Sequence, residues 1–263
     1  MTDKLKNCRV FVFDLDGTLY LGEDALPGAH EIISGLEQMG KNYIYLTNNS
    51  SRSTRDYITR LRKLGFPCET ENMFSSGMAT AMFLNEHFPQ NSVYLVGTQA
   101  FKNELLDYGI CICEEDADVV CVGFDTELYY EKLRKAANFL RRGAAFIAAN
   151  PDFVCPMPGD EVLPDCGSIC ALLTASTGLY PKYIGKPNRE MIDIISAKTS
   201  VPNENIAVIG DRLYTDIAAG VNAGAVSVCV LSGETNREMI SSSPVKPDYI
   251  FPSVSELLSH LKR

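Results

Sequence analysis

The most constraining feature of this sequence is a set of short apolar runs that each stop at a polar residue. Four runs share this form: residues 8–13 before Asp14, 42–46 before Thr47, 205–210 before Asp211 and 226–231 before Ser232. Near-continuous apolar strands are typical of a parallel sheet that helices cover on both faces. In such sheets ligands bind at the carboxyl ends of the strands, which is where these polar residues fall. The pattern therefore predicts an α/β fold with a polar, ligand-binding edge.

A middle segment separates the early pair of runs from the late pair. From about residue 77 to 178 it has strand-like stretches of its own, such as VYLVG, DVVCVGF and AAFIAAN, with helical stretches between them. We therefore predict a discontinuous sheet domain formed by residues 1–76 and 179–263, with a second α/β domain inserted as residues 77–178. The two halves of the first domain would then place their polar strand ends on one rim.

Charge and cysteine content restrict the partners and the compartment. The 263 residues carry a net charge of -9 with a pI near 4.9. Binding a phosphate backbone requires a face rich in Lys and Arg, so no nucleic acid partner is expected. The first apolar stretch is too short for a membrane span or a signal peptide, so we expect no membrane attachment and a cytoplasmic location. The nine cysteines fit neither zinc pairs nor a disulfide framework and are interpreted as reduced thiols.

The segment DLDGTLY, residues 14–20, is the most specific motif. Asp14 stands at the mouth of an apolar strand, Asp16 lies two positions on, and Gly17 permits a sharp turn. Because alternate residues point the same way, the two carboxylates face one small volume and repel each other. A divalent cation shared by Asp14 and neighbouring oxygens would offset that repulsion. A solvated turn is the alternative, against which the flanking strand and the other motifs argue.

Two further segments offer donors for a phosphate group. Thr47, Asn48 and Asn49 follow the second strand, where a hydroxyl and carboxamides are suited to phosphoryl oxygens, but the same residue types also cap helices. Lys186, in GKPN before an apolar helical run, would supply a fixed positive charge to a transferring phosphoryl group. A single lysine is more often an exposed residue, so this interpretation depends on the other motifs.

The segment GDRLYTDI, residues 210–217, adds two carboxylates. Asp211 directly follows the strand AVIG, and Asp216 lies five residues on. Oxygen ligands from Asp14, the backbone carbonyl of Asp16 and Asp211, completed by water and substrate, suit Mg²⁺. For Asp216 the pattern leaves three roles open: a direct metal ligand, a residue that orients a ligand or water, and a helix cap.

In order and spacing these segments resemble the four motifs of the haloacid dehalogenase superfamily. The wording DLDGTLY, TNNSSRS, GKPN and GDRLYTDI looks like its NagD-like subfamily, which includes the 4-nitrophenylphosphatases. The resemblance extends over nearly the whole chain, from Asp14 to Asp216. It implies a Rossmann-like parallel-sheet core, an inserted α/β cap domain of type C2, and a Mg²⁺-dependent phosphatase that acts on small phosphorylated metabolites.

The resemblance also implies a role for each matching residue. Asp14 would be the nucleophile that forms an aspartyl phosphate, and Asp16 the general acid and then the general base. Three residues would bind the phosphate: Thr47, Asn48 and Lys186. The metal would be held by Asp14, the backbone carbonyl of Asp16 and Asp211, with Asp216 in support.

The cap loops leave the substrate open. NPDF, residues 150–153, matches a subfamily segment near the substrate entrance, but LPDCGS, residues 163–168, stands where PGxGS is expected, with Asp165 in place of a glycine. Sugar phosphates, nucleoside monophosphates, phosphoglycolate, pyridoxal phosphate and aryl phosphates all remain candidate substrates. The resemblance further suggests a homodimer formed through the cap.

Other function classes fit the sequence less well. A receiver module of a signalling system carries its phosphorylated Asp on a later strand, is about half as long and needs no second acid such as Asp16. A hydrolytic dehalogenase would leave the predicted magnesium ligands superfluous. The chain has neither GxGxxG after a strand nor GxxxxGK[ST], which excludes dinucleotide and P-loop ATP sites. A binding-only or very narrow-range member of the same fold is the remaining alternative, although no motif residue is missing.

Overall fold

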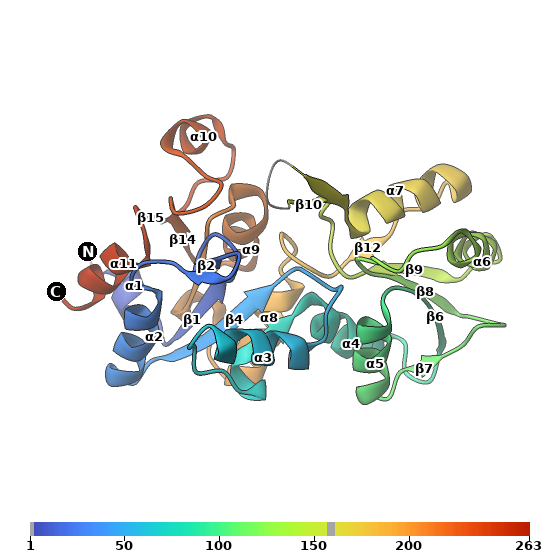
Figure 1. Ribbon diagram of the computed structural model, residues 1–263, viewed down its shortest axis with the longest axis horizontal. Coiled ribbons are helices and arrows are strands. Elements are labelled where there is room, and N and C mark those ends of the chain that lie inside the picture. The colour runs from blue at the N-terminus through green and yellow to red at the C-terminus, as the bar shows by residue number, and fades with distance from the viewer. Residues whose placement is uncertain (1–2, 157–160) are drawn as a thin grey trace. The chain divides into compact units, whose positions relative to one another are not determined.

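The computed structural model describes residues 3–156 and 161–263 (Figure 1). The chain forms two compact units, and each contains a parallel sheet of its own. The first unit comprises Met1–Thr47, Ile58–Phe74 and Lys186–Arg263. The second comprises Asn48–Tyr57 and Ser75–Gly185.

The first unit contains a six-stranded sheet in the order β15, β14, β13, β1, β4, β5. Its strands are β1 (Val10–Asp14), β4 (Asn42–Thr47), β5 (Met73–Ser75), β13 (Ile206–Gly210), β14 (Val226–Val230) and β15 (Tyr249–Phe251). β1 is central, and it pairs in parallel with β13 on one side and β4 on the other. Its first four residues are fully buried, as a strand covered on both faces requires.

Helices cover both faces of this sheet. They are α1 (Lys4–Asn7), α2 (Ala29–Gln38), α8 (Glu190–Thr199), α9 (Ala218–Ala223), α10 (Arg237–Ser242) and α11 (Val254–Leu261). From β1 the chain steps to β4, and from β13 it steps to β14 in the opposite direction along the sheet. Because such crossovers are right-handed, α2 and α9 lie on opposite faces. α11 packs beside α2, and α8 packs beside α9.

The second unit contains a five-stranded parallel sheet in the order β12, β9, β8, β6, β7. Its strands are β6 (Ser92–Val96), β7 (Cys111–Ile112), β8 (Val119–Val122), β9 (Ala145–Ala148) and β12 (Lys182–Tyr183). Its helices are α4 (Ser76–His87), α5 (Gln99–Asp107), α6 (Tyr130–Arg141) and α7 (Cys166–Thr177). Side chains of α6 and α7 form an apolar core with β6, β8 and β9, and α4 packs beside α5 (Figure 1). None of the helices in the described residues combines the length and apolarity that crossing a bilayer requires.

The remaining elements are the helix α3 (Thr54–Lys63), three short helical turns and two short hairpins. The turns are η1 (Thr70–Asn72), η2 (Asn203–Asn205) and the π-helical η3 (Leu213–Ile217). The hairpins pair β2 (Tyr20–Leu21) with β3 (Asp24–Ala25) and β10 (Val154–Pro156) with β11 (Val162–Pro164). The predicted α/β fold with a parallel sheet is confirmed.

The second unit is larger than the predicted insertion of residues 77–178. The chain stays in the second sheet beyond residue 178, because β12 pairs in parallel with β9. Residues 48–57 also belong to this unit, since Ser50 and Thr54 hydrogen-bond to Asn150 and Glu104 there. The predicted boundaries missed both extensions because each depends on partners that are distant in sequence.

Candidate active site

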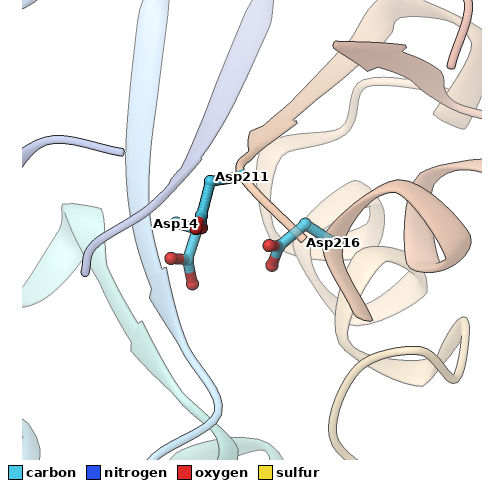
Figure 2. Close-up of side chains that lie close together, drawn as sticks. All are labelled: Asp14, Asp211 and Asp216. Carbon is cyan, nitrogen blue, oxygen red and sulfur yellow. The ribbon is translucent and has the colours of Figure 1, made fainter. Parts of the chain in front are cut away.

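The site begins where β1 and β13 end side by side. Asp14 is the last residue of β1, and Asp211 directly follows β13. The two strands are paired in parallel register, with Phe13 opposite Ile209, so their carboxyl ends meet. Two carboxylates from opposite ends of the sequence are thereby placed at one edge of the sheet (Figure 2).

The third carboxylate comes from the π-helical turn η3. Asp216 is 1% exposed, and its Oδ2 accepts a hydrogen bond from the backbone N–H of Arg212 at 3.1 Å. This bond turns the side chain back toward the strand end. One carboxylate oxygen from each of Asp14, Asp211 and Asp216 lies within 4.8 Å of the others (Figure 2). Turns with π-helical hydrogen bonding are frequent at functional sites, and here the turn supplies a buried acid.

Lys186 joins two of these acids. The lysine side chain is 2% exposed, and its Nζ lies 2.5 Å from Asp14 Oδ1 and 2.5 Å from Asp216 Oδ1. Ion pairs that are this buried depend on good geometry and on both partners being present. Lys186 thus lies at the end of β1, and its predicted contact with phosphate stays a prediction. We call Asp14, Lys186, Asp211 and Asp216 the acidic cluster.

The acidic cluster contains more negative than positive charge, and the pKa values of Asp14 and Asp211 are raised. Burial raises the pKa of Asp14, the neighbouring Asp216 adds to the effect, and Lys186 opposes it. Burial and Asp216 raise the pKa of Asp211 to about 6. Burial alone would lower the pKa of Lys186, but the charges of Asp14 and Asp216 raise it. Three carboxylates facing one ammonium favour the approach of a further cation.

The oxygens of the cluster are suited to a divalent metal. Both oxygens of Asp216 accept bonds from the protein, from Lys186 and from the Arg212 backbone. Asp211 Oδ2 accepts from the Glu234 backbone N–H at 2.8 Å, whereas its buried Oδ1 has no hydrogen-bond partner among the described residues. Because two further carboxylates lie close to that of Asp211, this oxygen is suited to bind a cation. Hard oxygen donors of this kind fit Mg²⁺, so Asp211 and Asp14 are the better candidates for direct ligands.

Asp16 and Thr47 lie near the same strand ends. Asp16 is exposed, two residues beyond β1, and Tyr20 Oη lies 3.4 Å from its Oδ2. Thr47 is buried at the end of β4, one residue after the Leu46 that lies opposite Asp14. The role of Asp16 in proton transfer stays a prediction.

Asn48 belongs to the second unit, unlike the neighbouring Thr47. Its Nδ2 donates to Asp152 Oδ2 at 2.8 Å, and its backbone carbonyl accepts from Ser76 Oγ at 2.5 Å. In this structure the side-chain amide therefore contacts a carboxylate. A contact of Asn48 with phosphate stays a prediction.

Asn150 links the Asn48–Asp152 contact to residues 163–168, the segment that departs from the subfamily pattern. Its Nδ2 donates to Asp152 Oδ2 at 2.9 Å and to Asp165 Oδ1 at 3.0 Å. Its Oδ1 accepts from Ser50 Oγ at 3.0 Å. Asn48, Asn150, Asp152 and Asp165 form one hydrogen-bonded group, which we call the amide knot. Asp165, which replaces the expected glycine, holds the loop at residue 150 to the start of α7.

The structure adds one feature that the motifs did not single out. The loop of Ser232–Thr235 after β14 contacts Asp211 through the backbone of Glu234, while the Glu234 side chain pairs with Arg212. The available signal was that Ser232 and Gly233 are polar or small residues directly after an apolar strand. The sequence gives no indication of the Glu234 contacts.

Comparisons with known proteins agree with this geometry. Residues 11–111 match a family described as haloacid dehalogenase-like hydrolase, and residues 183–257 match one described as HAD-hydrolase-like. An acid sugar phosphatase of Staphylococcus aureus is 33% identical over 262 residues, which cover 98% of this chain and 100% of that protein.

Solved structures are similar over the whole chain as well. A 4-nitrophenylphosphatase from Thermotoga maritima is 41% identical, covers 98% of each chain and has a TM-score of 0.94. NagD from E. coli K-12 is 35% identical, covers 95% of this chain and 98% of its own, and has a TM-score of 0.88.

Proposed function

The chain belongs to the haloacid dehalogenase-like hydrolases, in the NagD-like subfamily of phosphatases. We propose that it hydrolyses small phosphomonoesters in a Mg²⁺-dependent reaction with Asp14 as the nucleophile. The enzyme is a phosphoric monoester hydrolase. The mechanistic proposal rests on the ion pairs of Lys186 with Asp14 and Asp216, and on the nearby Asp211 oxygen that has no hydrogen-bond partner among the described residues.

The proposed reaction has two transfers. A carboxylate oxygen of Asp14 forms a bond to phosphorus while the ester P–O bond breaks, and the leaving oxygen takes a proton from Asp16. Asp16 then removes a proton from water, whose oxygen attacks phosphorus and displaces the carboxylate of Asp14. Inorganic phosphate is released, and Asp16 is again protonated for the next substrate. The position of Asp14 at the end of β1, paired with Lys186, and that of Asp16 two residues further on support this division of roles.

Lys186 and Thr47 have positioning roles in this proposal. The ammonium of Lys186 is fixed by two carboxylates, so it needs little reorganisation to stabilise charge on the transferring phosphoryl group. Thr47 would donate its hydroxyl to a phosphoryl oxygen, and its position at the end of the strand beside β1 supports this role. Asn48 would contribute a further donor, because its amide nitrogen carries two N–H groups and the bond to Asp152 uses only one of them.

Mg²⁺ would be held by Asp14, Asp211 and the backbone carbonyl of Asp16. Once bound, the metal would offset the negative charge of the carboxylates and of the phosphoryl oxygens. We assign Asp216 to support rather than direct ligation, because both of its oxygens already accept protein hydrogen bonds. Its role would be to orient Lys186 and the turn that follows Asp211.

The substrates named for the relatives define the first compounds to try. The relatives include an acid sugar phosphatase and a 4-nitrophenylphosphatase, so we propose sugar phosphates and aryl phosphates ahead of nucleotides. We also propose that the second unit is a cap of type C2 that selects the leaving group. A homodimer through this cap stays a prediction, which sedimentation velocity over a concentration series would check. The nine free thiols support the proposed cytoplasmic location, since reducing compartments preserve them.

Phosphate release tests the proposed reaction. 4-Nitrophenyl phosphate and a panel of sugar, nucleoside and carboxylic acid phosphates are each assayed with excess Mg²⁺ or with EDTA. We expect turnover that requires Mg²⁺ and falls by at least about 10³-fold in Asp14→Asn, because an amide does not form the acyl phosphate.

The matched control is Asp24→Asn, which changes an exposed aspartate of β3 in the same unit. It is expected to keep wild-type turnover. Full activity of a folded Asp14→Asn protein, or equal activity in EDTA, would remove the proposed mechanism.

A further inference from the structure

The loop after β14 holds the two strand ends of the acidic cluster together. The N–H of Glu234 donates to Asp211 Oδ2 at 2.8 Å, and the N–H of Thr235 donates to the backbone carbonyl of Asp211 at 3.1 Å. Ser232 Oγ donates to the carbonyl of Gly17 at 2.8 Å. The loop is therefore bonded both to the turn after β1 and to the turn after β13.

Two glycines leave just enough space for the Asp211 carboxylate. A Cβ atom added at Gly233 would lie 2.0 Å from Asp211 Oδ2, and one added at Gly17 would lie 2.6 Å from the same oxygen. Carbon and oxygen atoms that are not bonded do not approach so closely. The carboxylate is thus confined between two bare Cα atoms, which fixes its rotation about the side chain.

The two oxygens of the Asp211 carboxylate have different surroundings. Oδ2 is held by the Glu234 N–H, whereas the buried Oδ1 has no hydrogen-bond partner among the residues that the structure describes. A loop that only closed the sheet edge would satisfy either oxygen equally well. The Ser232–Thr235 loop donates a hydrogen bond to Oδ2 of Asp211 and leaves Oδ1 to accept another ligand.

The Glu234 side chain fastens the loop to the residues that follow Asp211. Its Oε2 lies 3.0 Å from Arg212 Nε and accepts a hydrogen bond from Tyr214 Oη at 3.1 Å. Because Glu234 and Arg212 carry opposite charges, the pair adds no net charge beside the acidic cluster. Its contribution is therefore to geometry.

We propose that Glu234 is a positioning residue for the metal site, and that the Ser232–Thr235 loop orients Asp211 so that Oδ1 points to the cation. This inference rests on the proposed role of Asp211 as a metal ligand. Glu234 acts through Asp211 and through the Arg212–Tyr214 segment, with no contact of its own to substrate. Loss of such outer contacts to a metal ligand typically weakens metal binding by about 10 to 100-fold.

Calorimetric titration of the metal-free enzyme with MgCl₂, without substrate, tests the proposal. We expect Gly233→Ala to weaken Mg²⁺ binding by about 100-fold and Glu234→Ala by about 10-fold. Glu234→Gln removes the same charge as Glu234→Ala but keeps a hydrogen-bond acceptor, so we expect it to bind Mg²⁺ within about threefold of wild type. At saturating Mg²⁺, kcat of both Glu234 variants should return to the wild-type value.

Glu238→Ala is the matched control, because it removes an exposed carboxylate of α10 that lies four residues further on. It should leave Mg²⁺ affinity unchanged. Should Gly233→Ala fail to fold, the two Glu234 variants decide the question. Equal losses in Glu234→Ala and Glu234→Gln would overturn the positioning role in favour of charge, and wild-type affinity in Glu234→Ala would overturn it altogether. A wild-type enzyme that turns over without binding Mg²⁺ would instead remove the metal site on which the inference rests.

Discussion

One group of neighbouring carboxylates in each unit is satisfied in the opposite way to the other. In the first unit, Asp14 and Asp216 share one ammonium, and Asp211 keeps an oxygen that has no partner among the described residues. In the second unit, Asp152 and Asp165 both accept hydrogen bonds from the neutral amide of Asn150. Both arrangements place acids close together inside the protein. Only the first leaves electrostatic repulsion for a ligand to relieve.

This contrast is the one expected between the proposed metal site and a set of hydrogen bonds that only shapes a loop. The amide donors belong to the protein itself and bond to each carboxylate in a fixed direction. The amide knot therefore fixes the conformation of the loop that carries it. The acidic cluster is instead incomplete in the protein alone, and its members gain from a cation. We expect neutralising substitutions to stabilise the cluster, and substitutions that add charge to disrupt the knot.

The largest expected effect on stability is in the amide knot. Asn150 is 0% exposed, and Asn150→Asp would replace its donating amide with a third carboxylate beside Asp152 and Asp165. We expect the free energy of unfolding to fall by about 3 kcal/mol or more at pH 7, as judged by urea denaturation. The control is Asn138→Asp on the exposed face of α6, where a change within about 0.5 kcal/mol is expected. Equal urea midpoints for the two variants would contradict the proposed role of the knot.

A smaller effect of opposite sign is expected in the acidic cluster. Asp211→Asn removes one of three repelling charges but keeps an oxygen that can accept from the Glu234 N–H. In EDTA we expect this variant to be more stable than wild type by about 1 kcal/mol. Added Mg²⁺ should stabilise wild type and leave the variant unchanged. If Asp211→Asn is less stable than wild type in EDTA, repulsion does not dominate the cluster.

The smallest expected effect is a change in the free energy of unfolding with pH. The pKa of Asp211 is raised from 3.8 to about 6 in the folded protein, so the folded state binds more protons than the unfolded state between these values. The stability that Asp211 contributes is therefore complete below about pH 4 and is lost as the pH rises through about 6. Urea midpoints of wild type in EDTA should fall relative to those of Asp211→Asn over this range. Parallel curves for the two proteins would show that Asp211 does not titrate there.

Much of the site could be predicted because strand ends are a local feature. The runs before Asp14 and Asp211 are apolar, continuous and cut off by acids, and parallel strands bring their carboxyl ends to one edge. The same reasoning placed the end of β4 beside them. The sequence did not reveal that β13 is the direct neighbour of β1, because pairing order depends on packing across the whole sheet.

The parts that were missed depend on short elements and on distant partners. β7 and β12 have two residues each, too few for any periodicity to be visible. No signal in the sequence indicated the contact between the Asn48 amide and Asp152, which lies far along the chain, and the predicted contact of Asn48 with phosphate stays a prediction. Glu234 follows no motif, and its importance arises only from where the loop after β14 folds back.

The pairing of β1 with β13 also affects how the protein is made. Val10 lies opposite Ile206, so during synthesis the central strand of the first sheet waits for its partner until most of the chain has left the ribosome. Meanwhile Ser75–Gly185, one continuous stretch, supplies every strand of the second sheet. The nascent chain thus carries an open apolar strand edge of the kind that chaperones protect. Asp14, the proposed nucleophile, is among the first residues to be made, whereas Asp211 and Asp216 are made late.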